Sequence, residues 1–233
     1  MCEALDGRLA RGQRCGDRRD RPHCHAGSVD THHHQFETAL RSFLADGVLI
    51  NDGSLTASGS TTYFEFILLT FAPIYRLQDV YINELFGGLS QLDDGVTTVH
   101  DVSQIHHSPK HSDAAIQALF DTGRRAAFGY FESAGANILG TNPGNQYPQD
   151  AFRIKKQWFS STDQLVTMIV GGEVYLSDAT TEQSWKIGRQ LGLQIATHIL
   201  SPFGIRPTWT RCARAKAASI KTSGSGPTTC SST

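Results

Sequence analysis

His32 and His34 are the residues whose types and spacing most directly suggest chemistry. They close the stretch Gly27-Ser28-Val29-Asp30-Thr31-His32-His33-His34, which is typical of a short strand. Successive side chains of a strand point to opposite faces, so His32 and His34 share one face and His33 takes the other. Neutral imidazole is a common ligand of zinc and similar divalent metals. The pair therefore indicates a metal site, and a polar, histidine-rich turn is the alternative.

Further polar residues stand at the ends of later apolar segments. His100 and Asp101 follow Val96-Thr97-Thr98-Val99, Glu173 follows Leu165 to Val170, and His198 lies in Gln194 to Ile199. On the sequence alone, we interpret His100 and Asp101 as turn residues and Glu173 as a solvent-facing carboxylate. Gln104, His106 and His107 belong to the loop after His100. They either line the mouth of a substrate site or are ordinary surface residues.

The elements that must position these residues alternate between strand and helix. Strands are expected near 29–33, 96–101, 125–131, 165–170 and 194–199. Strands separated by helices are the signature of parallel βαβ units. Both an open doubly wound sheet and a TIM-type barrel place their sites at the carboxyl ends of the strands. A full barrel needs eight strands, and only about five are visible.

The apolar periodicity predicts the intervening helices. Phe36, Leu40, Phe43 and Leu44 recur as on an amphipathic helix, and a second helix is expected over 77–93. Ser112 is a plausible N-cap for a helix closed by Gly123, and a capping box at Thr180 opens a helix that runs to Leu191. Phe64 to Phe71 fits a buried helix or a strand, and residues 132–150 read as a polar loop.

Composition narrows the class of protein. The chain has 233 residues, of which 39% are hydrophobic, and a formal net charge of −1. These values suit a globular protein and favour neither nucleic acid nor an anionic membrane as partner. The sequence has no run of about 18 apolar residues, so we predict no membrane span. Residues 1–25 lack the apolar core of a secretory signal.

The five cysteines all lie in the flanks of the chain, at positions 2, 15, 24, 212 and 230. An odd number, with none in the expected core, argues against a disulfide framework and fits a reducing compartment, so we expect a cytoplasmic protein. Cys24 stands between His23 and His25, but no second pair follows at zinc-finger spacing. Residues 1–26 and 205–233 lack periodicity, and we expect both flanks to be disordered.

Five segments in a fixed order resemble a known family. They are Asp30-Thr31-His32-His33-His34, Tyr75-Arg76-Leu77-Gln78-Asp79-Val80-Tyr81, Asp94-Gly95-Val96-Thr97-Thr98-Val99, Ser108-Pro109-Lys110-His111-Ser112-Asp113 and Leu191-Gly192-Leu193-Gln194-Ile195-Ala196-Thr197-His198. Together they are similar to the amidohydrolase superfamily, and most to the branch of metal-dependent hydrolases that includes cytosine deaminase and atrazine chlorohydrolase. The resemblance covers about residues 27–204.

The resemblance implies a (β/α)₈ barrel with one divalent metal, zinc or iron. His32 and His34 match the ligand pair of the first strand, and His198 matches the histidine that ends the fifth. In such enzymes the metal makes hydroxide available near neutral pH, and the hydroxide attacks a carbon that carries an amino, amide or halide leaving group. The implied substrate is a small cyclic molecule with a non-peptide C–N bond or a similar leaving group.

The family's later residues have no match in this sequence. No histidine occurs after His198, and nothing after Pro202 matches the further ligand, the proton-handling glutamate or the last aspartate. The sequence thus resembles a barrel truncated at both ends, and no catalytic acid or base is assigned. The alternative function is an inactive barrel remnant that at most binds metal. Open strand edges would favour homo-oligomers of such a fragment.

Overall fold

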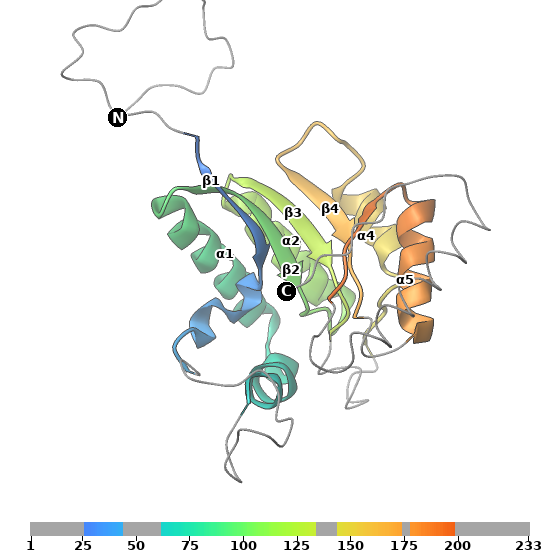
Figure 1. The fold of residues 1–233 in the computed structure, drawn as a ribbon, viewed down its shortest axis with the longest axis horizontal. Helices are drawn as coiled ribbons and strands as arrows, with labels where there is room; N and C mark the ends of the chain where they lie inside the picture. The colour runs from blue at the N-terminus through green and yellow to red at the C-terminus, as the bar shows by residue number, and fades with distance from the viewer. Residues whose placement is uncertain (1–25, 44–61, 134–143, 174–177, 199–233) are drawn as a thin grey trace, which may run out of the picture.

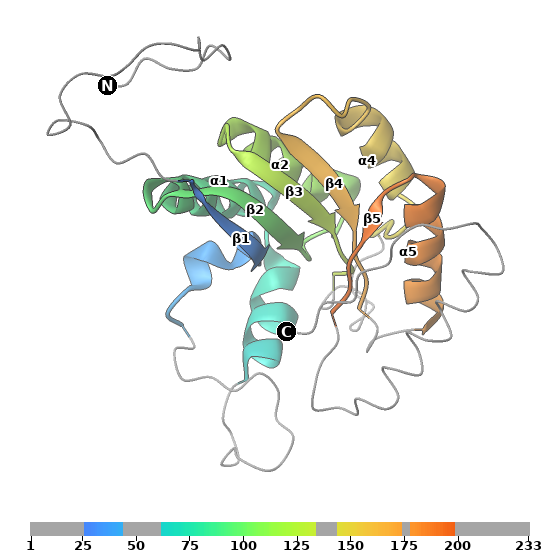
Figure 2. The same ribbon diagram turned by 45° about the horizontal axis from the view of Figure 1, so that its top comes forward.

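A curved sheet of five parallel strands organises the protein. The computed structural model describes residues 26–43, 62–133, 144–173 and 178–198. The strands lie in chain order: β1 (Ser28–His33), β2 (Val96–Ser103), β3 (Arg125–Tyr130), β4 (Val166–Val170) and β5 (Gln194–Ile195). All four pairings are parallel, so the carboxyl ends of the strands meet at one edge of the sheet (Figures 1 and 2). This is the arrangement of half a parallel barrel, as expected.

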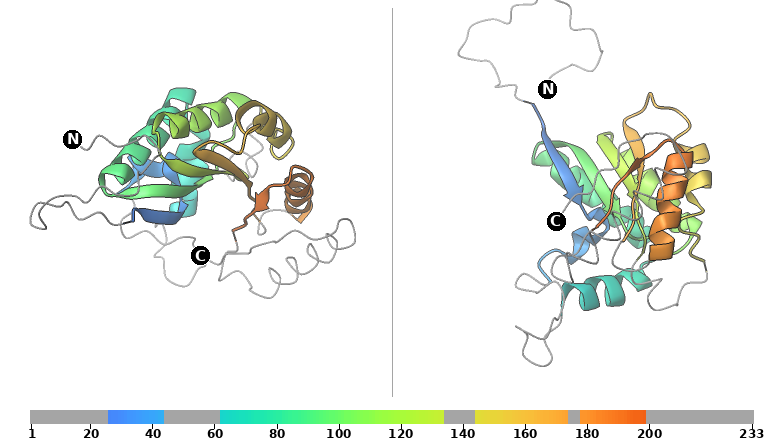
Figure 3. Two further views of the ribbon diagram at one scale, coloured as in Figure 1. Left: turned by 90° about the horizontal axis from the view of Figure 1, so that it is seen from above. Right: turned by 45° about the vertical axis from the view of Figure 1, so that its right-hand side comes forward.

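Helices connect the strands and follow one side of the sheet (Figure 3). They are α1 (Leu77–Asp93), α2 (Pro109–Asp121), α4 (Ala151–Trp158) and α5 (Asp178–Gln190). Shorter elements follow β1: the 3₁₀ helix η1 (Gln35–Leu40), the π-helix η2 (Phe64–Phe71) and the 3₁₀ helix η3 (Ala72–Ile74). None of the helices in the described ranges is long and apolar enough to cross a membrane.

The hydrophobic core lies between the sheet and these helices. Alternate residues of the central strands are buried there: Ala126, Phe128 and Tyr130 from β3, and Val166, Met168 and Val170 from β4. Since side chains alternate along a strand, the intervening residues point to the opposite, concave face. Thr167 and Ile169 on that face are exposed and half-buried, respectively. The burial pattern therefore distinguishes the helix-covered face of the sheet from the concave face.

Several element boundaries differ from the expectations. The histidine pair is followed by a six-residue 3₁₀ helix rather than by a longer amphipathic helix, and the chain leaves helical geometry at Arg41, with ψ 139°, and at Ser42, with φ 78°. Helix α2 begins at Pro109 with Ser108 as its N-cap, so Ser112 lies inside the helix. Helix α4 was not expected, and the Phe64–Phe71 segment is helical.

The last strand is shorter than expected. Only Gln194 and Ile195 pair with β4, and a separate bridge joins Glu173 to His198. His100 and Asp101 lie within β2, so their assignment to a strand-end turn was wrong. The expected disordered flanks, 1–26 and 205–233, fall outside the described residues except for residue 26.

Candidate metal centre

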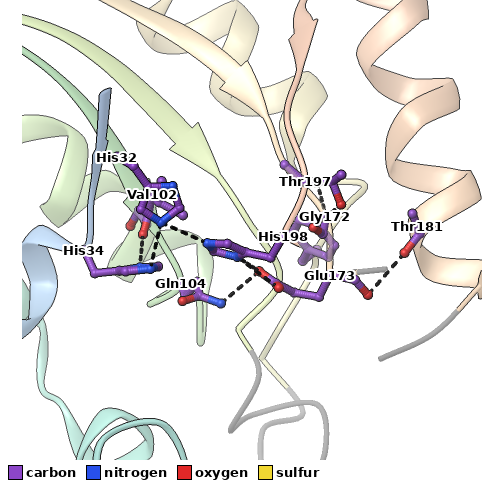
Figure 4. Close-up of polar contacts among 12 residues, drawn as sticks. His32, His34, Val102, Gln104, Gly172, Glu173, Thr181, Thr197 and His198 are labelled. Carbon is purple, nitrogen blue, oxygen red and sulfur yellow. Dashed lines mark hydrogen bonds and ion pairs between the residues drawn. The ribbon is translucent and has the colours of Figure 1, made fainter. Parts of the chain in front are cut away.

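Three histidines far apart in the sequence meet at the carboxyl edge of the sheet (Figure 4). His32 lies near the end of β1, His34 follows the strand, and His198 lies beyond β5. One ligand nitrogen from each ring lies within 4.8 Å of the other two. Nε2 of His32 is 3.3 Å from Nε2 of His34 and 3.2 Å from Nε2 of His198. Two nitrogens bound to one tetrahedral zinc at about 2.0–2.1 Å lie about 3.3 Å apart, so the spacing fits that metal.

The hydrogen bonds of the outer ring nitrogens show why a cation fits. Nδ1 of His34 lies 3.0 Å from the carbonyl oxygen of Val102, and Nδ1 of His198 lies 2.8 Å from Oε1 of Glu173. A carbonyl or a carboxylate only accepts, so both Nδ1 atoms carry a proton, and in the neutral rings both Nε2 atoms present lone pairs. His32 can donate to only one of them. A metal ion among the three Nε2 atoms would use the lone pairs that His32 leaves without a donor.

Burial keeps the two β1 imidazoles neutral. It lowers the pKa of His32 to about 4 and that of His34 to about 3, and the positive charge that a protonated His198 would carry lowers both further. Metal binding needs the neutral ring, and protons compete with it. A metal at these two rings would therefore meet little competition from protons down to about pH 5. His33 instead pairs with Asp30, whose Oδ2 lies 3.0 Å from its Nδ1.

Glu173 holds His198 from behind, and our expectation of a solvent-facing carboxylate was wrong. Its exposed fraction is 0%, because the chain after β4 turns it inward beside β5. Its Oε1 also accepts a hydrogen bond of 2.8 Å from Nε2 of Gln104. A carboxylate on the outer nitrogen fixes the tautomer and the orientation of a metal-binding histidine. No sequence pattern marked this role, since Glu173 and His198 are 25 residues apart.

A cavity of about 530 Å³ lies beside the two β1 histidines. Its wall includes Glu37, Tyr63, Leu40 and Ile67. The Tyr63 hydroxyl donates a 2.5 Å hydrogen bond to Glu37. Burial raises the pKa of Glu37 to about 7, although the hydrogen bond from Tyr63 opposes the shift. Sequence reasoning missed Glu37; its position three residues after His34, on the first turn of η1, was the signal that could have found it.

The three residues expected at a substrate mouth take different places. Gln104 is buried and bonded to Glu173, directly behind the histidine cluster. His106 lies in the core, where its ring nitrogens meet the Ser112 hydroxyl and the Ser103 carbonyl. His107 is also buried, and its Nε2 lies 2.6 Å from the Ala72 carbonyl oxygen. None of the three is among the residues that line the cavity.

The sequence matches no protein-family model and no curated protein. Solved structures with the same fold are similar to it. A zinc-bound adenosine deaminase from Xanthomonas campestris is 18% identical with a TM-score of 0.57, and the match covers 84% of this chain and 42% of the deaminase. A mutant atrazine chlorohydrolase from Arthrobacter aurescens, complexed with zinc and atraton, is 16% identical with a TM-score of 0.59, covering 82% and 46%.

A guanine deaminase from C. acetobutylicum with bound guanine gives 14% identity and a TM-score of 0.55, covering 84% of this chain and 43% of the deaminase. The expected likeness to amidohydrolase structures is thus confirmed at the level of the fold. At these identities the comparison shows the fold alone. The chain spans less than half the length of the structures it matches.

Proposed function

We propose that this chain is a metal-dependent hydrolase of the amidohydrolase type, which acts on non-peptide C–N bonds, or on a similar leaving group, of a small cyclic substrate. The observation that carries the proposal is the meeting of three Nε2 atoms, two of which present lone pairs when their rings are neutral. The fold supports it, because the enzymes named above are deaminases and a chlorohydrolase, and two of those structures contain zinc.

The metal would be held by His32, His34 and His198, with zinc as the first choice and iron as the alternative. When bound, such a metal lowers the pKa of a water molecule and makes hydroxide available near neutral pH. The chain's own contribution is orientation: the Val102 carbonyl and the Glu173 carboxylate aim two of the rings. The cavity beside His32 and His34 has the volume for a small cyclic molecule.

Metal titration tests the proposal. The full chain, stripped with a chelator, is titrated with zinc, and we expect one site per chain. His32→Ala and His198→Ala should each weaken zinc binding by more than about 100-fold, since even outer contacts of ligands are worth 10–100-fold. His33→Ala is the matched control, because its ring pairs with Asp30 instead. If all three variants bind zinc as the wild type does, the assignment of the ligands is wrong.

Turnover separates the two candidate functions. Metal-dependent release of ammonia or chloride from a panel of amino- and chloro-substituted heterocycles would support the hydrolase. The alternative is an inactive metal-binding remnant, favoured by the short span of the match, less than half of each enzyme. Tight zinc binding without any turnover would support that alternative.

Homo-oligomers through open strand edges are part of the same proposal. Within the described residues, β1 pairs only with β2, and β5 pairs only with β4. An unpaired edge offers backbone groups to another chain. Sedimentation velocity over a concentration series should show a dimer or a larger species, and a monomer at every concentration would contradict this expectation.

A further inference from the structure

Arg124 is a buried arginine behind the histidine pair. It lies in the turn between α2 and β3, directly after Gly123, whose φ of +68° lets the chain reverse. Its exposed fraction is only 3%. A buried guanidinium is costly unless its donors are used, so its contacts indicate its role. Each of its two terminal nitrogens donates to the side chain of a different glutamine.

The first arm leads to His32. Nη1 of Arg124 donates to Oε1 of Gln91 over 2.5 Å, and Nε2 of Gln91 donates to Oδ2 of Asp30 over 2.9 Å. The other oxygen of Asp30 accepts the backbone N–H of His32 over 3.1 Å. Helix α1, which carries Gln91, is thereby tied to the backbone of the first histidine.

The second arm leads to the residue after His34. Nη2 of Arg124 donates to Oε1 of Gln35. Gln35 is fully buried, and its Nε2 donates to the Glu84 carbonyl over 2.5 Å. Its backbone N–H points to Oδ1 of Asp101 over 3.4 Å. Both the oxygen and the nitrogen of the Gln35 side-chain amide thus have partners. These contacts hold the backbone next to His34 in place.

We propose that Arg124 is a positioning residue for the metal site, and that its two glutamine arms fix both ends of the segment from His32 to His34. The inference rests on the proposed function, in which these rings bind a metal. The planar guanidinium presents donors in a fixed fork, so one side chain can set the spacing between the two arms. A lysine has one mobile ammonium and cannot hold both glutamines in that geometry.

Charge explains why an arginine suits this place. Two buried carboxylates, Glu84 and Asp101, lie near it, and burial raises the pKa of each. Both oxygens of Glu84 and Oδ2 of Asp101 lack a hydrogen-bond partner in the described part of the chain. A neutral residue at position 124 would leave these acids without a nearby positive charge. The test variant therefore keeps a positive charge at position 124 and removes only the planar guanidinium.

The informative variants are Arg124→Lys, which keeps the charge, and Gln91→Leu, which cuts the first arm. Gln117→Leu is the matched control, because Gln117 also donates from a helix to an aspartate but lies exposed on α2. The metal-free full chain is first examined by NMR of the histidine ring nitrogens. Arg124→Lys should shift the His32 and His34 resonances and leave those of His107 and His111 in place. Gln91→Leu should shift His32 more than His34.

Metal binding is measured next. Arg124→Lys should weaken zinc binding about tenfold or more and alter the visible absorption of bound Co²⁺, and Gln91→Leu should weaken it about fivefold. Unshifted ring resonances in the folded variants would overturn the proposal. Should Arg124→Lys fail to fold, the proposal stands or falls on whether Gln91→Leu shifts the His32 resonance. If the rings shift but the wild type binds no metal, the proposed function fails and the positioning role stands.

Discussion

The two sides of the histidine cluster are built differently. On the β1 side, His32 lies in a six-residue strand that pairs with β2, His34 directly follows that strand, and the Arg124 arms hold their backbone. On the β5 side, His198 lies beyond a two-residue strand and is joined to the sheet by a single bridge to Glu173. Its ring depends on the Glu173 carboxylate, and Gln104 holds that carboxylate in turn.

The two sides therefore fix the positions of their histidine rings by different kinds of contact. A paired strand fixes the backbone through many hydrogen bonds, so the loss of one contact is shared among the others. A short strand end has few such bonds, and the orientation of His198 rests on one buried carboxylate. We therefore expect metal binding to respond more strongly to changes around Glu173 than to matched changes around Asp30.

Glu173→Gln should have the largest effect on that comparison. The amide keeps the size of the carboxylate but loses its charge and one acceptor, and its NH2 group can donate to Nδ1 of His198, so the tautomer of that ring is no longer fixed. We expect zinc affinity to fall by about 10–100-fold in titrations of the stripped protein. Glu182→Gln, an exposed glutamate on α5 paired with Lys186, is the control. Equal zinc affinity in both variants would show that Glu173 does not orient the ligand.

Glu37 tests the electrostatics of the β1 side. Its pKa is raised to about 7, so its contribution to stability is present below its ordinary pKa of 4.5 and is lost as the pH rises through about 7. From pH 5 to pH 8, metal-free wild type should lose about 2 kcal/mol of unfolding free energy relative to Glu37→Gln. Urea denaturation at both pH values measures the difference.

Glu65→Gln serves as the control for that pH series, because Glu65 is exposed on η2. Its unfolding free energy should follow that of the wild type at both pH values. A Glu37→Gln protein with the same pH dependence as the wild type would show that the Glu37 carboxylate is not held in its protonated form.

Asp30→Asn is the matched counterpart of Glu173→Gln. Asparagine can still accept the backbone N–H of His32, and the second arm and the β1–β2 pairing remain. We expect zinc affinity to fall about fivefold or less. Asp163→Asn, in an exposed turn, is the control. A loss as large as that of Glu173→Gln would mean that the two sides are equally fragile.

Gln104→Leu should have the smallest effect. It removes the hydrogen bond from Gln104 to Glu173 but leaves both contacts of Glu173 with His198, at 2.8 and 3.0 Å. We expect zinc affinity to fall about threefold, measured in the same titration. A loss beyond that of Glu173→Gln would point to a direct role of Gln104 at the metal or the substrate.

The class of fold and the positions of the three clustered histidines could be predicted from the residues alone. Four of the five strands fall within a few residues of their expected places because their apolar, β-branched segments are bounded by polar turns. The alternation of strand and helix led to a parallel sheet, and parallel strands bring their carboxyl ends together. His32, His34 and His198 could be selected because each stands at such an end.

The residues that surround the three clustered histidines could be identified only from the folded chain. Burial is a property of packing, so the sequence could not show that Glu173 lies behind His198 or that Arg124 lies behind β1. His106 and His107, for which the sequence left a substrate mouth and the protein surface open, are buried and bonded to partners up to 35 residues away. Local pattern places a residue on a strand end, whereas long-range contacts decide which way its side chain faces and what it meets.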